Sequence, residues 1–225
     1  MKPKKCALIS TPRAGTHYLR MTLDNHPKIG WAGEFFRPDS KYRNSPLYKE
    51  HFEIKDYIYD NTITPFVGNF CYVGFVWHLT LNSDLPFSKI DKFILLERKY
   101  KLAQFVSLKI ATETKVWRDK ETKEKVEVLP KNLFDFIDRQ TKLYEDFKSL
   151  NLDYKKVYYE DLCKDFDKTI NSIQDYLNVE RFELDPAMLQ KQEKRPLREV
   201  IKNYEEVKLY DGFYKIWIYI RLWPS

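Results

Sequence analysis

Short apolar runs alternate with segments of helical periodicity, and this alternation constrains the fold more than any other feature of the chain. Strand-like apolar runs occur at residues 5–10, 28–33, 70–77, 91–97 and 156–159. Apolar side chains recur at three- and four-residue steps in residues 18–23, 100–114, 133–150 and 166–177. Continuous apolar centres are typical of strands buried on both faces of a parallel sheet. The order strand, helix, strand, helix therefore predicts an α/β fold with a central parallel sheet and helices on both faces.

Neither the length nor the composition of the chain indicates more than one domain. Its 225 residues suit one domain, and no Gly/Ser-rich linker or internal repeat interrupts them. The net charge of +6 favours anionic ligands such as nucleotides, acidic glycans or nucleic acid, although scattered lysines are equally typical of a solvated surface. No apolar stretch approaches the length of a membrane span, and the run near the N-terminus is too short for a signal peptide.

The cysteines and histidines favour neither a disulfide framework nor a metal site. Cys6 and Cys71 sit inside apolar runs and are expected to be buried core residues, and three cysteines cannot all pair. The four histidines show no ligand spacing with one another or with the cysteines. We therefore expect no metal requirement and a reducing, cytoplasmic environment.

The loop after the first apolar run carries the strongest chemical signal. The sequence STPRAGTH at 10–17 lies between a predicted strand and a predicted helix. Backbone N–H groups and the dipole at a helix N-terminus attract anions, and Gly15 allows close backbone approach. Arg13 adds a fork of donors for phosphate or sulfate oxygens, and Thr16 adds a hydroxyl. The residues expected to contact the anion are Pro12, Arg13, Ala14, Gly15, Thr16 and His17.

The same loop lacks the Gly-Lys-Ser/Thr ending of the Walker nucleotide-binding loop. This absence argues against an ordinary ATP- or GTP-hydrolysing enzyme. The alternative interpretation is a capped helix start after a core strand, with Arg13 simply solvated.

A strand followed by T-P-R-A-G-T-x-x-L resembles the 5′-phosphosulfate loop of sulfotransferases that use 3′-phosphoadenosine 5′-phosphosulfate (PAPS). The resemblance implies a P-loop-like fold, PAPS as the donor and no need for magnesium. It also implies a 3′-phosphate site, because Arg98 ends the strand 93–98 and Ser107 lies on the helix that follows. Lys99 could replace Arg98 there, and we prefer Arg98 for its bidentate geometry. Arg195, in a late polar stretch, is expected over the same phosphate.

Four further segments are similar to the bacterial trehalose 2-sulfotransferase-like branch of this family. They are residues 33–36, 73–78, 96–117 and 159–162. The branch implies that the acceptor is a hydroxyl on a carbohydrate or glycolipid. Two positions depart from the family pattern, since Tyr100 stands where an acidic residue is common and Ala14 replaces the commoner Ser. The segment after residue 40 gives no match, so the acceptor pocket is not identified.

Two residues are candidates for the base that takes the proton of the acceptor hydroxyl. Glu34 follows a short run that we expect to be a strand beside the first, and it matches the base proposed for the branch. His78 ends the run 70–77, at the edge where parallel sheets bind ligands, and the ordinary pKa of histidine, about 6.5, suits proton transfer. Glu34 is preferred, and both stay open. Arg13 is expected to stabilise charge on the leaving phosphate.

Two other functions compete with the sulfotransferase. A nucleotide-dependent kinase with a degenerate loop would need a loop lysine and a metal-binding carboxylate, and no convincing pair is found. A nucleotide- or polyanion-binding module would use the +6 charge and an aromatic residue such as Trp117, but no nucleic-acid motif is visible. We therefore expect a small-molecule or glycan acceptor and no nucleic-acid partner, and we leave a homodimer open.

The remaining expectations concern organisation. We expect a single domain over residues 1–225, with a helical and aromatic segment at about 185–225 that closes over the cofactor side. Residues 51–60 are expected to be helical, and residues 118–128 to form a solvated loop or hairpin. Glu160 and Asp161 are expected to hold a loop or cap a helix.

Overall fold

The computed structural model describes residues 4–31, 34, 71–80, 87–117, 123–187 and 195–208. The chain divides into two compact units, and each is described by itself. The first holds residues 1–99 and 146–187, and the second holds residues 100–145 and 188–225. The helix predicted at 51–60, part of the loop predicted at 118–128 and most of the segment predicted at 185–225 lie outside the described residues. The single-domain organisation stays a prediction.

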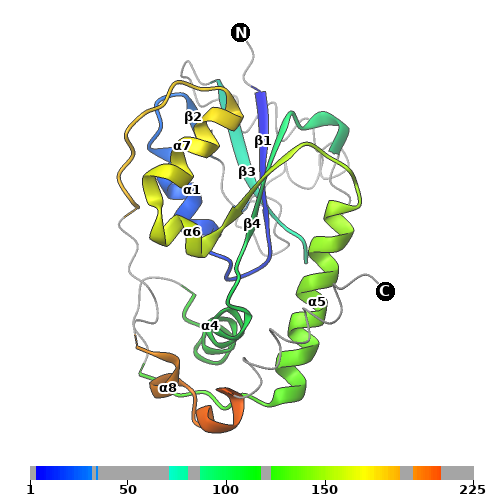
Figure 1. The fold of residues 1–225 in the computed structure, drawn as a ribbon, viewed down its shortest axis with the longest axis vertical. Helices are drawn as coiled ribbons and strands as arrows, with labels where there is room; N and C mark the ends of the chain where they lie inside the picture. Colours follow the sequence, from blue (N-terminus) through cyan, green and yellow to red (C-terminus); the bar gives the residue numbers. More distant parts are fainter. Residues whose placement is uncertain are drawn as a thin grey trace, which may run out of the picture. The chain divides into compact units, whose positions relative to one another are not determined.

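A five-stranded parallel sheet forms the centre of the first unit (Figure 1). In chain order the strands are β1 (Lys4–Ser10), β2 (Ile29–Trp31), β3 (Tyr72–His78), β4 (Lys92–Glu97) and β5 (Tyr154–Tyr158). Across the sheet they lie in the order β2-β3-β1-β4-β5, and every neighbouring pair is parallel. The predicted α/β class with a central parallel sheet is therefore confirmed.

One expectation about the sheet was wrong. The strand before Glu34 was expected beside the first strand, yet β3 lies between β1 and β2. The register of β1 and β3 places Ser10 opposite His78. Strand adjacency depends on where a later segment inserts, which local periodicity does not encode.

Both faces of the sheet are buried, as continuous apolar runs require, because successive side chains of a strand point to opposite faces. On one face the strands share a core with α1 (Thr16–Asp24), α6 (Tyr159–Lys164) and α7 (Phe166–Leu177), which gather on that side in Figure 1. On the other face, Phe93 of β4 packs against Phe147 in the last turn of α5 (Pro130–Lys148), with ring centroids 6.1 Å apart. The prediction of helices on both faces is confirmed.

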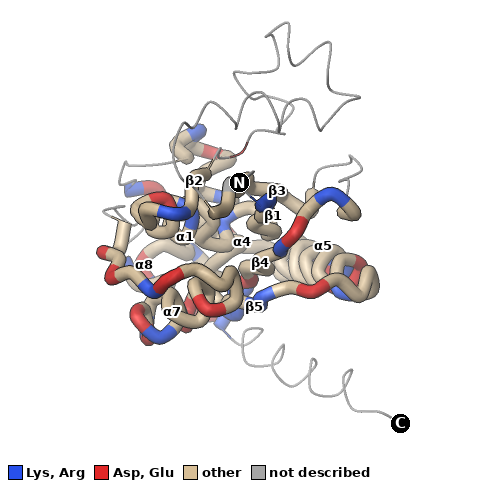
Figure 2. Tube along the Cα trace, turned by 90° about the horizontal axis from the view of Figure 1, so that it is seen from above, with Lys and Arg blue, Asp and Glu red and all other residues tan. Residues whose placement is uncertain are grey.

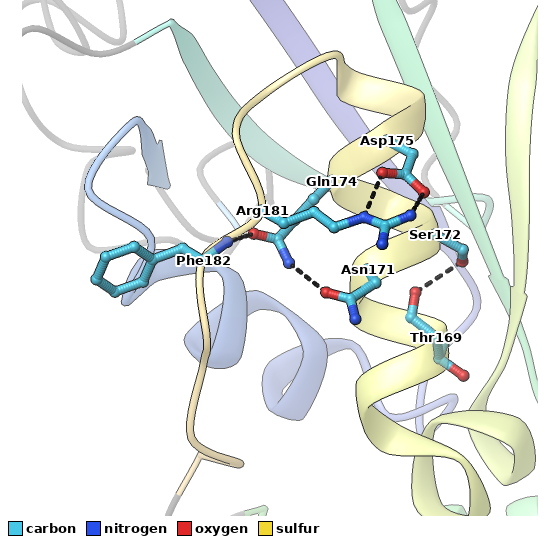
Figure 3. Close-up of polar contacts among 7 residues, drawn as sticks. All are labelled: Thr169, Asn171, Ser172, Gln174, Asp175, Arg181 and Phe182. Atoms are coloured by element: carbon cyan, nitrogen blue, oxygen red, sulfur yellow. Dashed lines mark hydrogen bonds and ion pairs between the residues drawn. The ribbon is translucent and has the colours of Figure 1, made fainter.

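The segment that follows α7 is fixed to the helix by polar side chains (Figure 3). Gln174 Oε1 accepts the backbone N–H of Phe182 at 2.7 Å. Arg181 donates two hydrogen bonds to Asp175, from Nε at 2.8 Å and from Nη2 at 2.7 Å. These contacts hold the chain that follows α7 against the helix, and residues 181–187 belong to the first unit.

The second unit has an apolar core of its own. Its helices are α4 (Lys101–Thr114), residues 130–145 of α5, and α8 (Leu197–Val200). Val126 and Ile201 form an isolated parallel bridge. The side chain of Asn203 accepts the N–H of Val128 at 2.9 Å and donates to its carbonyl at 2.9 Å. The helices predicted at 100–114 and 133–150 are confirmed. Three short helices, α6, α8 and η2 (Phe87–Lys89), were not predicted because they are too short to show periodicity.

The cysteines correct one expectation. All three are free, and Cys6 is buried as predicted. Cys71 is exposed, so the prediction that it belongs to the core was wrong. The apolar run begins before the strand does, and Cys71 lies in the bend that precedes β3.

Charged residues of both signs are interspersed along the described trace, as Figure 2 shows. Within the described part of the chain, no helix is long and apolar enough to cross a membrane.

Candidate active site

The carboxyl ends of the five strands carry most of the predicted site residues. The loop 11–15 follows β1, Glu34 follows β2, His78 ends β3, Arg98 follows β4 and Tyr159 follows β5. The chain leaves β1 towards β2 on one side and leaves β4 towards β5 on the other. Ligands of open α/β sheets bind outside the carboxyl ends of the strands at such a switch point, here between β1 and β4.

The loop after β1 makes a tight turn with two residues in the left-handed region. Arg13 has φ 64° and Gly15 has φ 96°, and the N–H of Ala14 donates to the carbonyl of Thr11 at 3.3 Å. Gly15 is the N-cap of α1, and no side chain among the described residues caps that helix. A turn of this kind aims successive backbone N–H groups at one point, where a bound anion is favoured.

Tyr159 packs against this turn and was given no role in the sequence analysis. A Cβ built on Gly15 would lie 2.3 Å from Cδ2 of the Tyr159 ring. Cζ of Arg98 lies 4.9 Å from the centroid of the same ring. Burial is the main cause that raises the pKa of Tyr159, and the thiol of Cys163 raises it further. One ring therefore supports both the loop and Arg98. One feature of the sequence could have indicated this role: Tyr159 is the last residue of the run 156–159, which was predicted to be a strand of the parallel sheet.

Arg98 and Lys99, the two rivals for a phosphate contact, have different surroundings. Arg98 Nη1 donates to the carbonyl of Arg13 at 3.2 Å, which places Arg98 against the loop. Lys99 Nζ pairs with Asp161 Oδ1 at 2.5 Å, and its backbone N–H donates to Glu160 Oε2 at 2.9 Å. Glu160 and Asp161 thus fix the residues after β4, which confirms the structural role expected for them.

The two arginines form a partly desolvated cationic pair beside the loop. Burial lowers the pKa of Arg13, and the nearby charge of Arg98 lowers it further, while Tyr159 and Glu34 oppose the shift. Burial likewise lowers the pKa of Arg98. The Glu160 carboxylate lies 4.0 Å from Arg98 Nε, beyond hydrogen-bond distance. Like charges held together away from water favour an anion as the third partner.

Glu34 and His78, the two candidate bases, lie in contact. His78 Nε2 is 3.4 Å from Glu34 Oε1. On its other side, His78 Nδ1 is 3.3 Å from Ser10 Oγ, and Ser10 Oγ is 2.7 Å from Thr16 Oγ1. Ser10, Thr16 and His78 are all buried. A continuous polar chain therefore runs from Glu34 to the anion loop. Its member Ser10 was not among the residues assigned to the site, although it is the first residue of the segment STPRAGTH.

The remaining predicted site residues belong to the second unit. Ser107 lies on α4, and Arg195 donates to the carbonyl oxygens of Lys123 at 3.1 Å and Glu124 at 3.0 Å. Their contact with a 3′-phosphate stays a prediction. Trp117 is exposed. Within the described residues, no group of three or more His, Cys, Asp or Glu side chains could hold a metal ion.

Comparisons with known proteins give a sequence relative and a distant structural likeness. No family model matches the chain. It is 23% identical over 227 residues to Nodulation protein H of Rhizobium meliloti (strain 1021), covering 93% of this chain and 92% of that protein. The solved structure of mouse sulfotransferase SULT7A1 complexed with PAP gives a TM-score of 0.47 at 15% identity. That likeness covers 81% of this chain and 61% of the mouse chain.

Proposed function

We propose that this chain is a sulfotransferase that moves a sulfuryl group from PAPS to an acceptor hydroxyl. One observation carries the proposal. The loop 11–15, with Arg13 in it and Arg98 against it, lies at the same edge of the sheet as the contact between Glu34 and His78. Sulfuryl transfer needs these two parts together, because one must hold the donor's anionic groups and the other must accept a proton. The loop sequence also lacks the Walker lysine that a magnesium-dependent kinase would use.

The residues divide into donor-binding and proton-accepting roles. Residues 12–17 would hold the 5′-phosphosulfate, and Arg98 would hold the 3′-phosphate. Arg98 is preferred over Lys99 because Arg98 contacts the loop whereas Lys99 is paired with Asp161. The contacts of Ser107 and Arg195 with the 3′-phosphate remain predictions from the sequence.

The transfer exchanges one bond for another. The acceptor oxygen forms a bond to sulfur, and the bond between sulfur and the bridging phosphate oxygen breaks, which leaves 3′-phosphoadenosine 5′-phosphate (PAP). The acceptor proton goes to the Glu34–His78 pair, and Arg13 and the loop N–H groups stabilise the charge that develops on PAP. We propose a carbohydrate or glycolipid acceptor from the resemblance to the trehalose branch, and a reducing compartment from the three free cysteines.

Calorimetry with PAP tests the donor site. The protein is expected to bind PAP equally well in EDTA and in magnesium, and to bind ATP with magnesium and a short oligonucleotide more weakly. Binding of PAP that strictly requires magnesium would contradict the proposal and favour the kinase.

Turnover of substituted proteins tests the base. Glu34→Gln keeps the shape of the side chain and removes its basicity, so kcat is expected to fall by about 10²-fold or more while PAP affinity changes little. Because the imidazole of His78 lies against the same carboxylate, His78→Asn is expected to lower kcat as well, by a smaller factor. Near-normal turnover in both variants would place the base elsewhere.

A further inference from the structure

The polar chain from Glu34 to Thr16 has two possible hydrogen-bond directions. Ser10 Oγ lies 3.3 Å from His78 Nδ1 and 2.7 Å from Thr16 Oγ1, and either hydroxyl of the Ser10–Thr16 pair could be the donor. A hydroxyl carries one proton, so Ser10 can donate to only one of these two partners at a time. When His78 Nδ1 accepts the Ser10 proton, Ser10 cannot donate to Thr16, and when Nδ1 donates, the Ser10 proton is released for Thr16.

The unprotonated pair sets the first direction. An ionised Glu34 only accepts, so the proton of neutral His78 lies on Nε2, which faces Glu34 Oε1 at 3.4 Å. Nδ1 is then an acceptor, and Ser10 donates its proton to it. Thr16 in turn donates to Ser10 Oγ. In this state the hydroxyl proton of Thr16 points to Ser10.

One additional proton reverses the whole chain. If His78 holds it, both ring nitrogens carry protons. If Glu34 Oε1 holds it and donates to Nε2, the single imidazole proton lies on Nδ1. In both forms Nδ1 donates to Ser10, so the proton of Ser10 loses its former acceptor. Thr16 Oγ1, at 2.7 Å, is an acceptor at hydrogen-bond distance, and once Ser10 donates to it the proton of Thr16 turns away from Ser10. Thr16 directly follows Gly15 at the start of α1, so its hydroxyl proton can turn to an anion held by the loop.

We propose that Ser10 and Thr16 are positioning residues that couple the proton on the Glu34–His78 pair to anion binding at the loop. This inference rests on the proposed function. When the pair takes the acceptor proton, Thr16 becomes a donor to the phosphate oxygen on which charge develops as the sulfuryl group departs. The two candidate bases then act as one unit, whichever of them holds the proton. Coupling between two sites is reciprocal, so a bound anion must favour the protonated pair.

Other charged groups act on the pair and must be separated from the hydroxyl chain. Arg13 of the loop interacts with Glu34, and Arg98 and Tyr159 act on Arg13. His17 lies next to Thr16 on α1. These groups, and the charge of the anion itself, influence the pair directly and remain when Ser10 is replaced. The contribution of the hydroxyl chain is therefore the difference between the wild-type protein and Ser10→Ala in how PAP affinity changes with pH.

Nitrogen NMR of the histidine rings tests the hydrogen-bond direction without any ligand. His78, assigned by comparison with His78→Asn, is expected to carry its proton on Nε2 at alkaline pH. Ser10→Ala removes the donor to Nδ1 and is expected to weaken this preference. His26 is an internal reference, because the N–H of Lys28 donates to its Nδ1 at 3.0 Å and its Nε2 lies 3.0 Å from the carbonyl of Glu180. A neutral His78 with its proton on Nδ1 in the wild-type protein would overturn the proposal.

The pH dependence of PAP affinity tests the coupling. As the solution is acidified, the PAP affinity of the wild-type protein is expected to rise about tenfold more than that of Ser10→Ala, the scale of one hydrogen bond to a charged group. Thr16→Val is expected to lose the same part of the rise, and the double variant no more than either single one. Thr22→Ala is the matched control, since Thr22 is another buried hydroxyl on α1 that accepts the N–H of Ala187 at 3.2 Å.

The two failures are distinguishable. If PAP binds and Ser10→Ala keeps the full wild-type rise, the coupling is refuted and the sulfotransferase proposal stands. If PAP binds at no pH, the proposed function is refuted, and the anion part of the coupling is refuted with it.

Discussion

Gly15→Ala tests how tightly the anion loop is built, and the structure gives the size of the effect. The added methyl group meets two obstacles. The φ of Gly15 is 96°, and L-residues pay about 1–2 kcal/mol in the left-handed region. The new Cβ would lie 2.3 Å from Cδ2 and 2.9 Å from Cε2 of Tyr159, and overpacking of this kind costs about 1–3 kcal/mol. Together they predict a loss of about 2–5 kcal/mol in the free energy of unfolding.

The Tyr159 ring cannot move away without a further loss. It lies against the guanidinium of Arg98, with 4.9 Å between Cζ and the ring centroid, and the thiol of Cys163 interacts with its hydroxyl. A displaced ring would therefore disturb Arg98 as well as the loop. We expect Gly15→Ala to weaken PAP binding by about tenfold or more, in addition to its effect on stability.

Urea denaturation and PAP calorimetry measure the two effects, and Gly74→Ala is the matched control. A Cβ on Gly74 would lie 2.5 Å from Cε3 of Trp31, but the backbone of Gly74 is not in the left-handed region. Gly74→Ala should thus lose about 1–3 kcal/mol and leave PAP affinity nearly unchanged.

A double variant separates the two obstacles. In a Tyr159→Ala background the ring is gone, and Gly15→Ala should then cost only the backbone strain of about 1–2 kcal/mol. A loss below about 1 kcal/mol for Gly15→Ala alone, or an equal loss with and without the Tyr159 ring, would refute the reasoning.

Three further predictions follow from individual contacts. Arg98→Ala is expected to weaken PAP binding by about 10–100-fold, and Lys99→Ala by less than about threefold. Adenosine 5′-phosphosulfate lacks the 3′-phosphate, so if Arg98→Ala weakens its binding as much as that of PAP, Arg98 does not contact the 3′-phosphate. Asn203→Ala removes two hydrogen bonds to Val128 and should destabilise the second unit by about 1–3 kcal/mol, seen as faster amide exchange, with Asn203→Asp intermediate. Burial raises the pKa of Asp24, so the folded protein binds the carboxyl proton more tightly than the unfolded chain does. The free energy of unfolding therefore falls as pH rises from the unfolded pKa of about 4 through the folded pKa. Asp24→Asn should make the urea midpoint depend less on pH over this range.

Parallel strand ends explain why much of the candidate site could be predicted. Each strand was found from its apolar run, and the carboxyl ends of parallel strands meet at one edge. Residues that follow a strand, such as Arg13, Glu34 and Arg98, were therefore assigned to one site before their contacts were known. Cys71 shows the limit of the same reasoning, because an apolar run does not mark the residue at which the strand begins.

The contacts that connect these residues could not be predicted. Tyr159 is 144 positions from Gly15, and Ser10 is 68 positions from His78. The first contact depends on which strands are neighbours, and the second on β3 inserting between β1 and β2. No local pattern in the sequence encodes either arrangement.

The sequence by itself therefore determined the α/β class, the five strands, the glycine turn and the types of side chain at the sheet edge. These follow from periodicity and from the chemistry of each residue, which are local properties. The tertiary structure alone decided that Arg98 rather than Lys99 meets the loop, and that Glu34 and His78 touch. It did so because strand order and side-chain packing are set by the burial of the whole core, to which residues far apart in the sequence contribute together.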